Sequence, residues 1–394
     1  MSKPTILFGT TVPEAVWYFL KEQAVYLAEQ GWDVHVVTSA GSGFGRLDDY
    51  FSSETRVYLH GIAMRRGPSP FRDVKALIDW ISLLRQVHPS IVVAGTPKAG
   101  LLGVLAAWLT RVPVRVYHLR GLRLQTQRRV LRAASWLAEL MTCSAATRIL
   151  SVSQSLGQEL FRLRLVQGGK VDVIGFGSSH GVDTDRFHPP SAEERRLARQ
   201  SFGIPDQGVA VGFAGRISED KGFPELLEAF TRLRSHQDNL WLVVAGEPET
   251  LDTAKRLEYF AAADDHIRVV RWFDEMNQFY WSLDIFCLPS LREGMPNVNL
   301  EAAACGLPVV STTATGCRDS LVNGVTGLLA EPSDPEKLLV ALSRLLNDPS
   351  LRSGMGIKGR TWVVHHFDER KVQYSLDIWL RELLPKPWAP GSVR

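Results

Sequence analysis

The chain is predicted to fold as two α/β domains, each built on a parallel β-sheet. Short β-rich runs alternate with longer helical patterns throughout the sequence, which is the pattern of parallel α/β units. The length of 394 residues exceeds that of most domains with a single core. A segment rich in Gly, Ser and Pro at 175–190 separates two similar halves. We therefore expect two Rossmann-like domains whose sheets face each other across a cleft.

Each half contains its own series of strands and helices. In the first half we expect strands at 5–9, 33–39, 90–95, 114–118 and 148–152, and helices at 14–30 and 98–110. In the second half we expect strands at 208–215, 240–246, 267–271, 284–289 and 307–312, and helices at 224–235, 274–282 and 297–305. These series predict an N-terminal domain of residues 1–180, a C-terminal domain of residues 181–366, and a helix and tail at 367–394 that pack back toward the N-terminal domain.

Composition and charge narrow the class of protein. Apolar residues make up 45% and charged residues 22% of the chain, as in ordinary soluble globular proteins. No apolar run approaches the roughly 18 residues that a membrane-spanning helix needs, and no signal peptide is visible. The four cysteines have neither metal-type nor disulfide-type spacing, so we expect reduced thiols in a cytoplasmic protein. The net charge of +3 is close to neutral, and we expect no nucleic-acid partner.

Seven arginines and no acidic residue lie between Arg111 and Arg132. One interpretation is a solvated helix face next to a strand. The other is a basic surface for anionic lipid or a lipid-linked diphosphate, since Lys and Arg clusters are attracted to such surfaces. The second interpretation predicts peripheral association with the inner face of the cell membrane.

Two carboxylates frame the most informative segment, Glu293-Gly-Met-Pro-Asn-Val-Asn-Leu-Glu301. The Gly and Pro indicate a tight loop, and the residues from Asn299 onward read as the first turns of a helix. One acid is therefore expected on the loop and the other about a turn inside the helix. The free N–H groups of a helix N-terminus between them favour an anion. Acceptors for hydroxyls beside donors for phosphate predict a sugar nucleotide as the ligand.

Two cations stand at the end of the first expected strand of the second half. Arg216 follows Gly215, and Lys221 precedes a helix expected to begin at Pro224. Cations at the carboxyl end of a strand beside a helix start suit a diphosphate. Arg can contact two oxygens at once, whereas Lys acts as a point charge. The alternative is a solvated loop in which Glu219 and Asp220 neutralise both cations.

Together these motifs resemble those of family 4 glycosyltransferases, which have the GT-B fold. The resemblance spans nearly the whole chain and is closest to bacterial enzymes of surface polysaccharides and lipid-linked saccharides. It rests on Phe213-Ala-Gly-Arg216 with Lys221-Gly222, on 288–302, and on Gly306-Leu-Pro-Val-Val310, Val152-Ser-Gln-Ser-Leu156, Gly181-Val-Asp-Thr-Asp-Arg-Phe187 and Asn323-Gly-Val-Thr-Gly-Leu328.

The resemblance implies a role for each matching residue. Glu301 would accept hydrogen bonds from the ribose, and Glu293 would face the transferred sugar. The donor diphosphate would lie against Gly215, Arg216 and Lys221, and the donor sugar and phosphate against Met295, Asn297 and Val298. Family members are retaining enzymes that need no metal and no bound cofactor. The two cations would then carry the charge role that a divalent metal fills elsewhere.

The first half departs from the family at one position. Family members commonly have His-Gly at the end of a first-half strand, near the reacting sugar. This chain has His118-Leu119-Arg120-Gly121, with Arg120 directly before the glycine. In an extended strand His118 and Arg120 point to the same face, so either could act at the donor sugar. The alternative for His118 is a buried structural histidine.

Three further segments have competing interpretations. Asp183-Thr-Asp185 matches the D-x-D metal motif of other glycosyltransferases, but its setting favours structural turn residues. Trp17-Tyr18-Phe19 fits core packing better than an apolar lip that contacts acceptor or lipid. The nucleotide base is expected near Arg271 and Trp272.

The sequence thus predicts a retaining, metal-independent transferase, a hexosyl- or N-acetylhexosaminyltransferase. Its donor would be a nucleotide-diphosphate sugar, most simply UDP-linked, and its acceptor a polyprenyl-diphosphate-linked saccharide. A soluble small-molecule acceptor, as in natural-product glycosylation, is the first alternative. The second is a catalytically inactive nucleotide-sugar-binding or membrane-scaffold protein.

Overall fold

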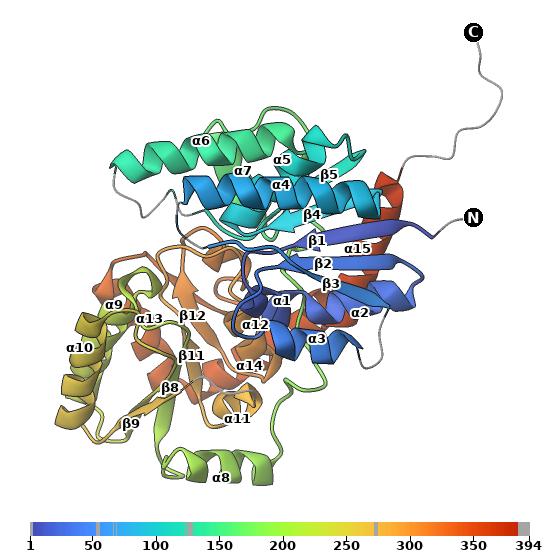
Figure 1. The fold of residues 1–394 in the computed structure, drawn as a ribbon. Helices are drawn as coiled ribbons and strands as arrows, with labels where there is room; N and C mark the ends of the chain where they lie inside the picture. Colours follow the sequence, from blue (N-terminus) through green and yellow to red (C-terminus); the bar gives the residue numbers. More distant parts are fainter. Residues whose placement is uncertain are drawn as a thin grey trace. The chain divides into compact units, whose positions relative to one another are not determined.

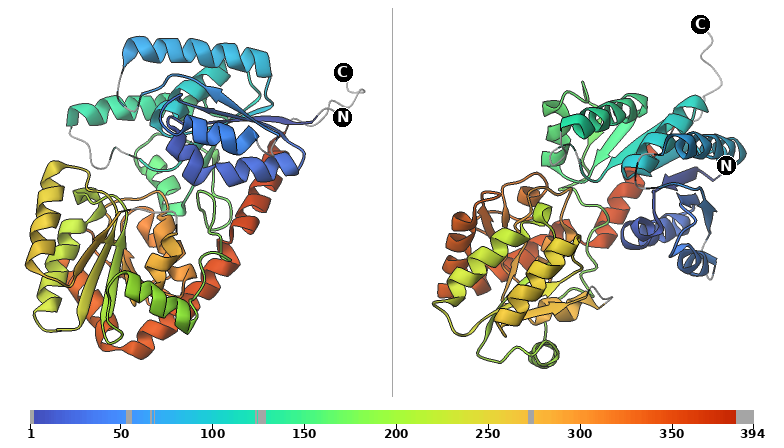
Figure 2. Two further views of the ribbon diagram at one scale, coloured as in Figure 1. Left: turned by 60° about the horizontal axis from the view of Figure 1, so that its bottom comes forward. Right: turned by 60° about the vertical axis from the view of Figure 1, so that its left-hand side comes forward.

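The computed structural model describes residues 3–52, 56–65, 67, 69–122, 124, 129–271 and 275–384, and for 129–131 the backbone alone. Contacts divide the chain into two compact units, drawn in Figure 1 and Figure 2. The N-terminal unit comprises Met1–Val152, Gly157–His180 and Val372–Arg394, and the C-terminal unit comprises Ser153–Leu156 and Gly181–Lys371. The main division thus falls within the Gly-, Ser- and Pro-rich segment, and the last helix contributes to the N-terminal unit.

A seven-stranded parallel sheet forms the centre of the N-terminal unit, counting the part of the chain that is described. The strand order β3-β2-β1-β4-β5-β6-β7 changes direction between β1 and β4, as in doubly wound folds. The strands are β1 (Thr5–Gly9), β2 (Asp33–Thr38), β3 (Val57–Gly61), β4 (Ile91–Gly95), β5 (Val114–Leu119), β6 (Arg148–Ser151) and β7 (Val171–Asp172).

Helices cover both faces of this sheet (Figure 1). The apolar residues of the first helices, together with Leu376 and Leu380 of the last one, form a single core against β1, β2 and β4. On the other face Trp80 packs so closely that a Cβ on Gly9 would lie 2.5 Å from its ring. The helices are α1 (Pro13–Phe19), α2 (Lys21–Glu29), α3 (Phe44–Ser52), α4 (Pro70–Val87), α5 (Pro97–Leu109), α6 (Arg129–Ala145), α7 (Gln154–Arg162) and α15 (Glu369–Leu383).

The single helix predicted over 14–30 is wrong, because the chain forms α1 and α2 with a break at Leu20. Leu20 leaves the helical region, with φ −136° and ψ −28°, and its side chain is buried in the core. The break lets α2 bury its own face, formed by Gln23, Ala24, Leu27 and Ala28, against the sheet. Periodicity alone missed it because neither Gly nor Pro stands at the junction.

The C-terminal unit is built on a six-stranded parallel sheet within the described residues, in the order β10-β9-β8-β11-β12-β13. Its strands are β8 (Val209–Ala214), β9 (Leu240–Ala245), β10 (Ile267–Val270), β11 (Ile285–Cys287), β12 (Val309–Thr312) and β13 (Gly327–Ala330). Its helices are α8 (Ala192–Ser201), η2 (Glu219–Lys221), α9 (Phe223–Arg234), α10 (Leu251–Ala263), α11 (Met276–Trp281), α12 (Asn297–Ala304), η3 (Cys317–Asp319), α13 (Pro335–Asn347) and α14 (Pro349–His366).

The predicted class of two α/β domains with parallel sheets is confirmed. In the C-terminal unit the strand order changes direction between β8 and β11, which are paired neighbours. Ligands of such sheets bind beyond the carboxyl ends of the strands at this point. The expected buried thiols are also confirmed, since Cys143, Cys287, Cys305 and Cys317 are all buried and free. Among the described residues no helix is both long enough and apolar enough to span a membrane.

Glu139 of α6 is a buried acid whose charge opposes folding. Its carboxylate accepts a 2.8 Å hydrogen bond from the Tyr117 hydroxyl, but burial outweighs this bond and raises the pKa of Glu139 to about 7. The folded state therefore favours the protonated acid more than the unfolded state does. The stability it contributes is complete below its unfolded pKa and is lost as the pH rises through about 7.

We predict that Glu139→Gln raises the free energy of unfolding by about 1–3 kcal/mol near pH 8. The gain should shrink toward zero near pH 5, because the native acid is then protonated. Denaturant unfolding at the two pH values measures both quantities, with the exposed Glu29→Gln as the matched control. A loss of stability near pH 8 would contradict this account of the buried acid.

Candidate active site

The two predicted donor cations lie on the turn that follows β8. Arg216 comes directly after the strand and Gly215, and Lys221 ends the short helix η2 before α9 begins. Gly222 has φ +67°, and a Cβ there would lie 1.9 Å from the carbonyl oxygen of Pro289. Only glycine permits this approach. The turn after β8 is therefore held directly against the loop after β11, where the backbone N–H of Leu291 donates to the Asp220 carbonyl over 2.9 Å.

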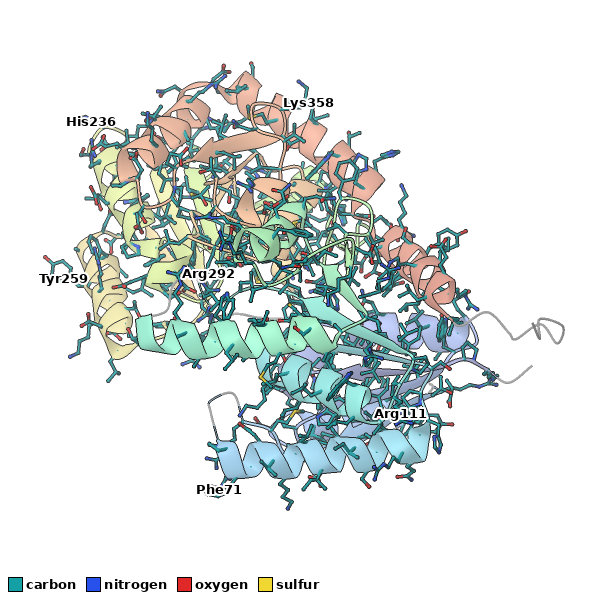
Figure 3. The ribbon with its side chains drawn as sticks, turned by 90° about the horizontal axis from the view of Figure 1, so that it is seen from above. Phe71, Arg111, His236, Tyr259, Arg292 and Lys358 are labelled. Atoms are coloured by element: carbon teal, nitrogen blue, oxygen red, sulfur yellow. The ribbon has the colours of Figure 1, made fainter. Side chains whose placement is uncertain are left out.

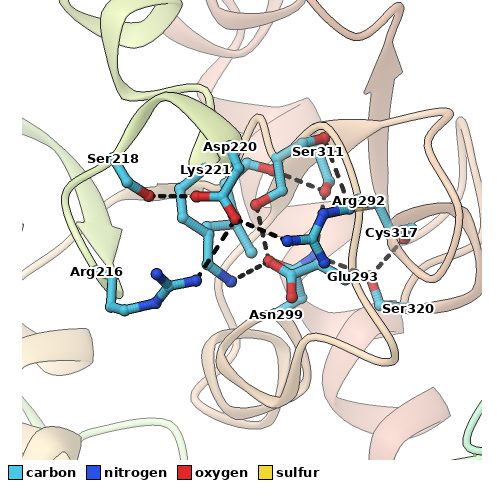
Figure 4. Close-up of polar contacts among 12 residues, drawn as sticks. Arg216, Ser218, Asp220, Lys221, Arg292, Glu293, Asn299, Ser311, Cys317 and Ser320 are labelled. Carbon is cyan, nitrogen blue, oxygen red and sulfur yellow. Dashed lines mark hydrogen bonds and ion pairs between the residues drawn. The ribbon is translucent and has the colours of Figure 1, made fainter. Parts of the chain in front are cut away.

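Glu293 lies on that loop and forms an ion pair with Lys221 (Figure 4). The Ser290 hydroxyl donates a 2.7 Å hydrogen bond to the same carboxylate oxygen, Oε1. The backbone N–H of Glu293 donates to the Thr315 carbonyl over 2.8 Å. The pair is largely shielded, with 18% of the Lys221 side chain and 14% of the Glu293 side chain exposed. Two residues that the sequence assigned to separate motifs thus form one unit.

Arg216 is half-exposed and contacts two carboxylates. It forms an ion pair with Glu249, and its Nη2 lies 3.5 Å from Asp220 Oδ2. The same oxygen lies 3.3 Å from Arg292. The predicted neutralising role is thus confirmed for Asp220.

Several contacts keep Asp220 ionised. Burial raises the pKa of Asp220, but the hydrogen bond from the Ser218 hydroxyl and the nearby cations outweigh it. The pKa of this carboxyl therefore lies below its ordinary value. A group of cations linked by an ionised acid can exchange partners when a diphosphate arrives.

Glu301 lies inside α12, as the sequence predicts, and Glu293 lies outside it. Glu301 Oε2 accepts a 2.7 Å hydrogen bond from the Tyr280 hydroxyl. Burial raises the pKa of Glu301, and the Tyr280 bond opposes this. Its second carboxylate oxygen can accept from a ligand hydroxyl. The surroundings of Glu301 therefore suit a neutral ligand with several hydroxyl groups better than an anion.

The N-terminus of α12 supplies backbone donors. Its cap residue Pro296 makes no side-chain capping bond. Of the three other residues expected to line the ligand, Met295 is buried and Asn297 and Val298 are half-buried. They lie on the short segment between the two acids, so the loop and the first turn of α12 form one surface.

Two serine hydroxyl groups form hydrogen bonds to the Glu293 loop and to the neighbouring Gly316. Ser153 Oγ donates to the Gly294 carbonyl over 2.6 Å, and Ser155 Oγ accepts a 2.7 Å bond from the Gly316 N–H. Both serines belong by their contacts to the C-terminal unit. Gly316 itself has φ +76°, and a Cβ there would lie 2.4 Å from the Gly294 oxygen and 2.5 Å from the Glu293 oxygen.

His118 and Arg120 lie together in the N-terminal unit, at the carboxyl end of β5. The Arg120 Nη2 atom lies 3.4 Å from His118 Nδ1, so the predicted shared face is confirmed. The structure adds a third member, His180, whose ring lies against Phe19 with centroids 5.8 Å apart. Sequence reasoning missed it as a site residue. His180 lies in the Gly177-Ser-Ser-His-Gly segment, whose two glycines and two serines are the sequence feature that could have drawn attention to it. In the structure Ser178 of this segment has a positive φ of 125°.

The aromatic run before the first break is not simple core packing. Tyr18 and Phe19 are 47% and 38% exposed, so the core interpretation is wrong for these two side chains. Trp17 is half-buried and carries the Arg46 guanidinium over its ring at 3.6 Å. Phe19 points instead toward Arg120, whose guanidinium carbon lies 5.4 Å from the ring centroid.

The arginines between 111 and 132 do not form one basic surface. Arg115 points inward, because its guanidinium donates to the carbonyls of Ala145 and Val112 over 2.8 and 2.7 Å. Arg120 points into the cluster with the two histidines. Of the side chains that are described, Arg111 and Arg132 are exposed. Arg123 and Arg128 lie outside the described residues, as does the side chain of Arg129.

Asp183 and Asp185 act as turn residues. Asp183 Oδ1 accepts bonds from the backbone N–H groups of Asp185 and Arg186, at 3.1 and 3.0 Å. Asp185 Oδ2 lies 3.2 Å from Arg370. Within the described residues no group of three or more His, Cys, Asp or Glu side chains is placed to hold a metal ion. Trp272, expected near the base, lies outside the described residues, and Arg271 is exposed on the surface.

Comparison with known proteins matches both halves of the chain. Residues 194–362 match the family described as glycosyl transferases group 1, and residues 15–177 match a glycosyl transferase 4-like domain. The capsular polysaccharide biosynthesis glycosyltransferase CapM of Staphylococcus aureus is 33% identical over 378 residues, which cover 96% of this chain and 97% of that protein.

More distant relatives agree with this match. The UDP-Gal:α-D-GlcNAc-diphosphoundecaprenol α-1,3-galactosyltransferase of Escherichia coli is 25% identical over 370 residues, covering 91% of this chain and 92% of that protein. The crystal structure of HepE from Anabaena with UDP and glucose superposes with a TM-score of 0.79 at 18% identity, covering 95% of this chain and 99% of that one. This likeness confirms the predicted GT-B fold.

The close approach at Gly316 gives a test of how the Glu293 loop is held. Gly316 and Gly324 have nearly equal φ angles of +76° and +75°, but a Cβ on Gly324 would meet nothing within 4 Å. Alanine should cost about 1–2 kcal/mol at either site for the left-handed backbone. At Gly316 the clash with two carbonyls should add about 2 kcal/mol or more. Denaturant unfolding compares the variants, and equal losses would contradict the steric constraint.

Proposed function

This chain belongs to the group 1 glycosyl transferases, and on that premise we propose that it transfers a sugar from a nucleotide-diphosphate donor with retention of configuration. The observation that carries the proposal is the Lys221–Glu293 ion pair beyond β8 and β11, with Arg216 on the same turn as Lys221. It sets two cations for a diphosphate beside an acid for the sugar. The Tyr280-bonded Glu301 supplies an acceptor for ribose hydroxyls.

The electrostatics of this group suggest how the donor is activated. Lys221 carries three N–H donors, so it can keep its contact with Glu293 while it binds a phosphate oxygen. Arg216 can leave its exposed pair with Glu249 for the diphosphate, where it stabilises the charge that grows on the leaving nucleotide. Glu293 then lies near the positive charge that develops on the sugar. The acceptor hydroxyl attacks from the face that the nucleotide leaves. These residues supply the charge stabilisation without a metal ion.

Two similar proteins support a proposal for the donor base and the acceptor. The Escherichia coli relative is named for UDP-galactose and a diphosphoundecaprenol acceptor, and the HepE structure holds UDP. We propose a UDP-linked donor and a polyprenyl-diphosphate-linked saccharide acceptor for this chain, in the synthesis of a surface polysaccharide. His118 and Arg120 are proposed to act on the acceptor side of the reaction.

An exposed apolar stripe favours the lipid-linked acceptor. On α4, Phe71, Val74 and Ile78 follow helical spacing and are 94%, 60% and 59% exposed, and Figure 3 shows Phe71 at the outer side of this helix. Lys75 and Arg85 continue the same face and are also exposed. An apolar stripe with basic neighbours fits the surface of an anionic membrane. Together with Arg111 and Arg132, it replaces the single arginine cluster as the proposed peripheral contact.

The structure gives less support to the two alternative functions, an inactive sugar-nucleotide binder and a transferase with a soluble acceptor. A catalytically inactive sugar-nucleotide binder would tolerate loss of the charged residues, yet Arg216, Lys221, Glu293 and Glu301 are all present. Lys221 is paired with Glu293, and Arg216 with Asp220. A soluble small-molecule acceptor would leave the α4 stripe without a partner.

Thermal shift across UDP-, GDP- and ADP-sugars tests the donor, because a bound ligand stabilises the folded state by mass action. We expect UDP-sugars to raise the unfolding temperature most. A larger shift with GDP- or ADP-sugars would replace the UDP assignment.

We predict that Glu293→Gln reduces turnover by about 10²-fold or more while nucleotide binding stays within a few-fold. Lys221→Ala should instead weaken nucleotide binding by about tenfold, because it removes a diphosphate contact. Initial-rate kinetics and calorimetric titration of UDP separate the two effects. Exposed Glu331→Gln is the matched control for lost charge. Normal turnover in both site variants would refute the assignment.

We also predict that the chain sediments with vesicles containing anionic lipid at moderate salt. The double variant Phe71→Ser/Ile78→Ser should lose most of this binding, since it removes the apolar contact. The control, Leu251→Ser, changes a leucine that is 83% exposed in the C-terminal unit and should bind as the native chain does. Failure of the native chain to bind would rule out the lipid-linked acceptor.

A further inference from the structure

Arg120 is a half-buried cation, and the described part of the chain supplies no carboxylate in contact with it. Its Nε and Nη1 atoms are buried and have no hydrogen-bond partner among the described residues. Its Nη2 atom lies 3.4 Å from Nδ1 of His118. The undescribed residues nearest in sequence, at 123 and 125–128, are Arg, Gln, Thr, Gln and Arg, and so carry no carboxylate. A buried charge left in this state costs several kcal/mol.

The groups around Arg120 are further nitrogen donors and an aromatic ring. His118 is 5% exposed, and its Nε2 atom is also buried without a partner in the described part of the chain. Burial, and then the charge of Arg120, lower the pKa of His118 and bring that of His180 to about 3. Both rings are therefore neutral at physiological pH and can donate an N–H without adding charge.

Backbone segments of β4 and α2 and the segment at 178–180 surround the cluster. Gly95 ends β4 directly beside His118, and a Cβ there would lie 3.8 Å from Arg120 Nε. On the other side, Gln23 of α2 donates a 2.9 Å hydrogen bond to the carbonyl of Ser179, next to His180. The segment also contains the left-handed Ser178, a conformation that costs energy outside glycine. The cluster is thus built by four separate elements of one unit.

We propose that Arg120, His118 and His180 form an anion site of the N-terminal unit that binds a phosphate group of the acceptor. A guanidinium can contact two phosphate oxygens in parallel, and the imidazole N–H groups can bind a third. A sugar hydroxyl could satisfy the unpaired N–H groups but not the buried charge. The proposal rests on the proposed lipid-diphosphate acceptor. The donor diphosphate has its own cations, Arg216 and Lys221, in the C-terminal unit.

The test uses the full-length chain and inorganic pyrophosphate, titrated by calorimetry in the presence of saturating UDP. With the donor site filled, the native chain should still bind pyrophosphate. Arg120→Met should bind it about tenfold or more weakly, because the fork of donors is lost. Arg120→Lys should fall between them. Arg56→Met removes an exposed arginine from the same unit and should bind as the native chain does.

A second titration, with UDP alone, identifies which phosphate uses the site. UDP affinity should be unchanged in Arg120→Met. If it falls, or if UDP abolishes pyrophosphate binding to the native chain, the cluster belongs to the donor and the acceptor site is refuted. Equal pyrophosphate binding by the native chain and Arg120→Met refutes the site altogether. Absence of UDP binding in the native chain would instead count against the proposed donor.

The free protein's stability is an independent measurement. A ligand site that holds an uncompensated buried charge is costly when empty, so Arg120→Met should unfold at the same temperature as the native chain or higher. A structural arginine would give the reverse, because its removal would lose satisfied contacts. A clear fall in unfolding temperature therefore overturns the proposal, even if the variant is too unstable for titration.

Discussion

The close approach of the turn after β8 to the loop after β11 is the constraint on which the candidate donor site depends. It exists because Gly222 presents no Cβ to the Pro289 carbonyl, where a side chain would lie 1.9 Å from the oxygen. Bonding of the Leu291 N–H to the Asp220 carbonyl fixes the approach. Once the two segments touch, Lys221 reaches Glu293 and Arg292 reaches Asp220. The parallel pairing of β8 and β11 places both segments at the same end of the sheet.

The two units handle charge in opposite ways. In the C-terminal unit each candidate cation already has a carboxylate partner, so its charge is compensated without a ligand. In the N-terminal unit the half-buried Arg120 lies beside two neutral histidines, with no carboxylate in the described surroundings. The anion site that we propose would compensate this charge when a phosphate binds. Glu139 is the reverse case, since burial lets this acid keep its proton up to about pH 7.

Local sequence patterns predicted secondary-structure elements well where a run of apolar residues itself favours a buried strand. The expected run 5–9 is β1, and nine other expected strands match β2, β4, β5, β6 and β8–β12 within about two residues. The placement of Glu293 on a loop and Glu301 in a helix also held, because Gly, Pro and the apolar run signal that boundary. The break at Leu20 escaped, since core packing rather than a breaker residue causes it. The seven arginines looked alike in sequence, but Arg115 and Arg120 turn inward while Arg111 and Arg132 stay exposed.

Periodicity and motif spacing, which are local properties of the chain, were enough to predict the two parallel-sheet domains, the family and the residue types of the candidate donor site. Tertiary structure alone decided the partners. Lys221 and Glu293 are 72 positions apart, and His180 joins His118 from 62 positions away. Which charges meet, and which are buried without a counter-ion, depends on how strands of one sheet bring distant loops to a common edge. No local pattern records that arrangement, and the chemistry of both sites follows from it.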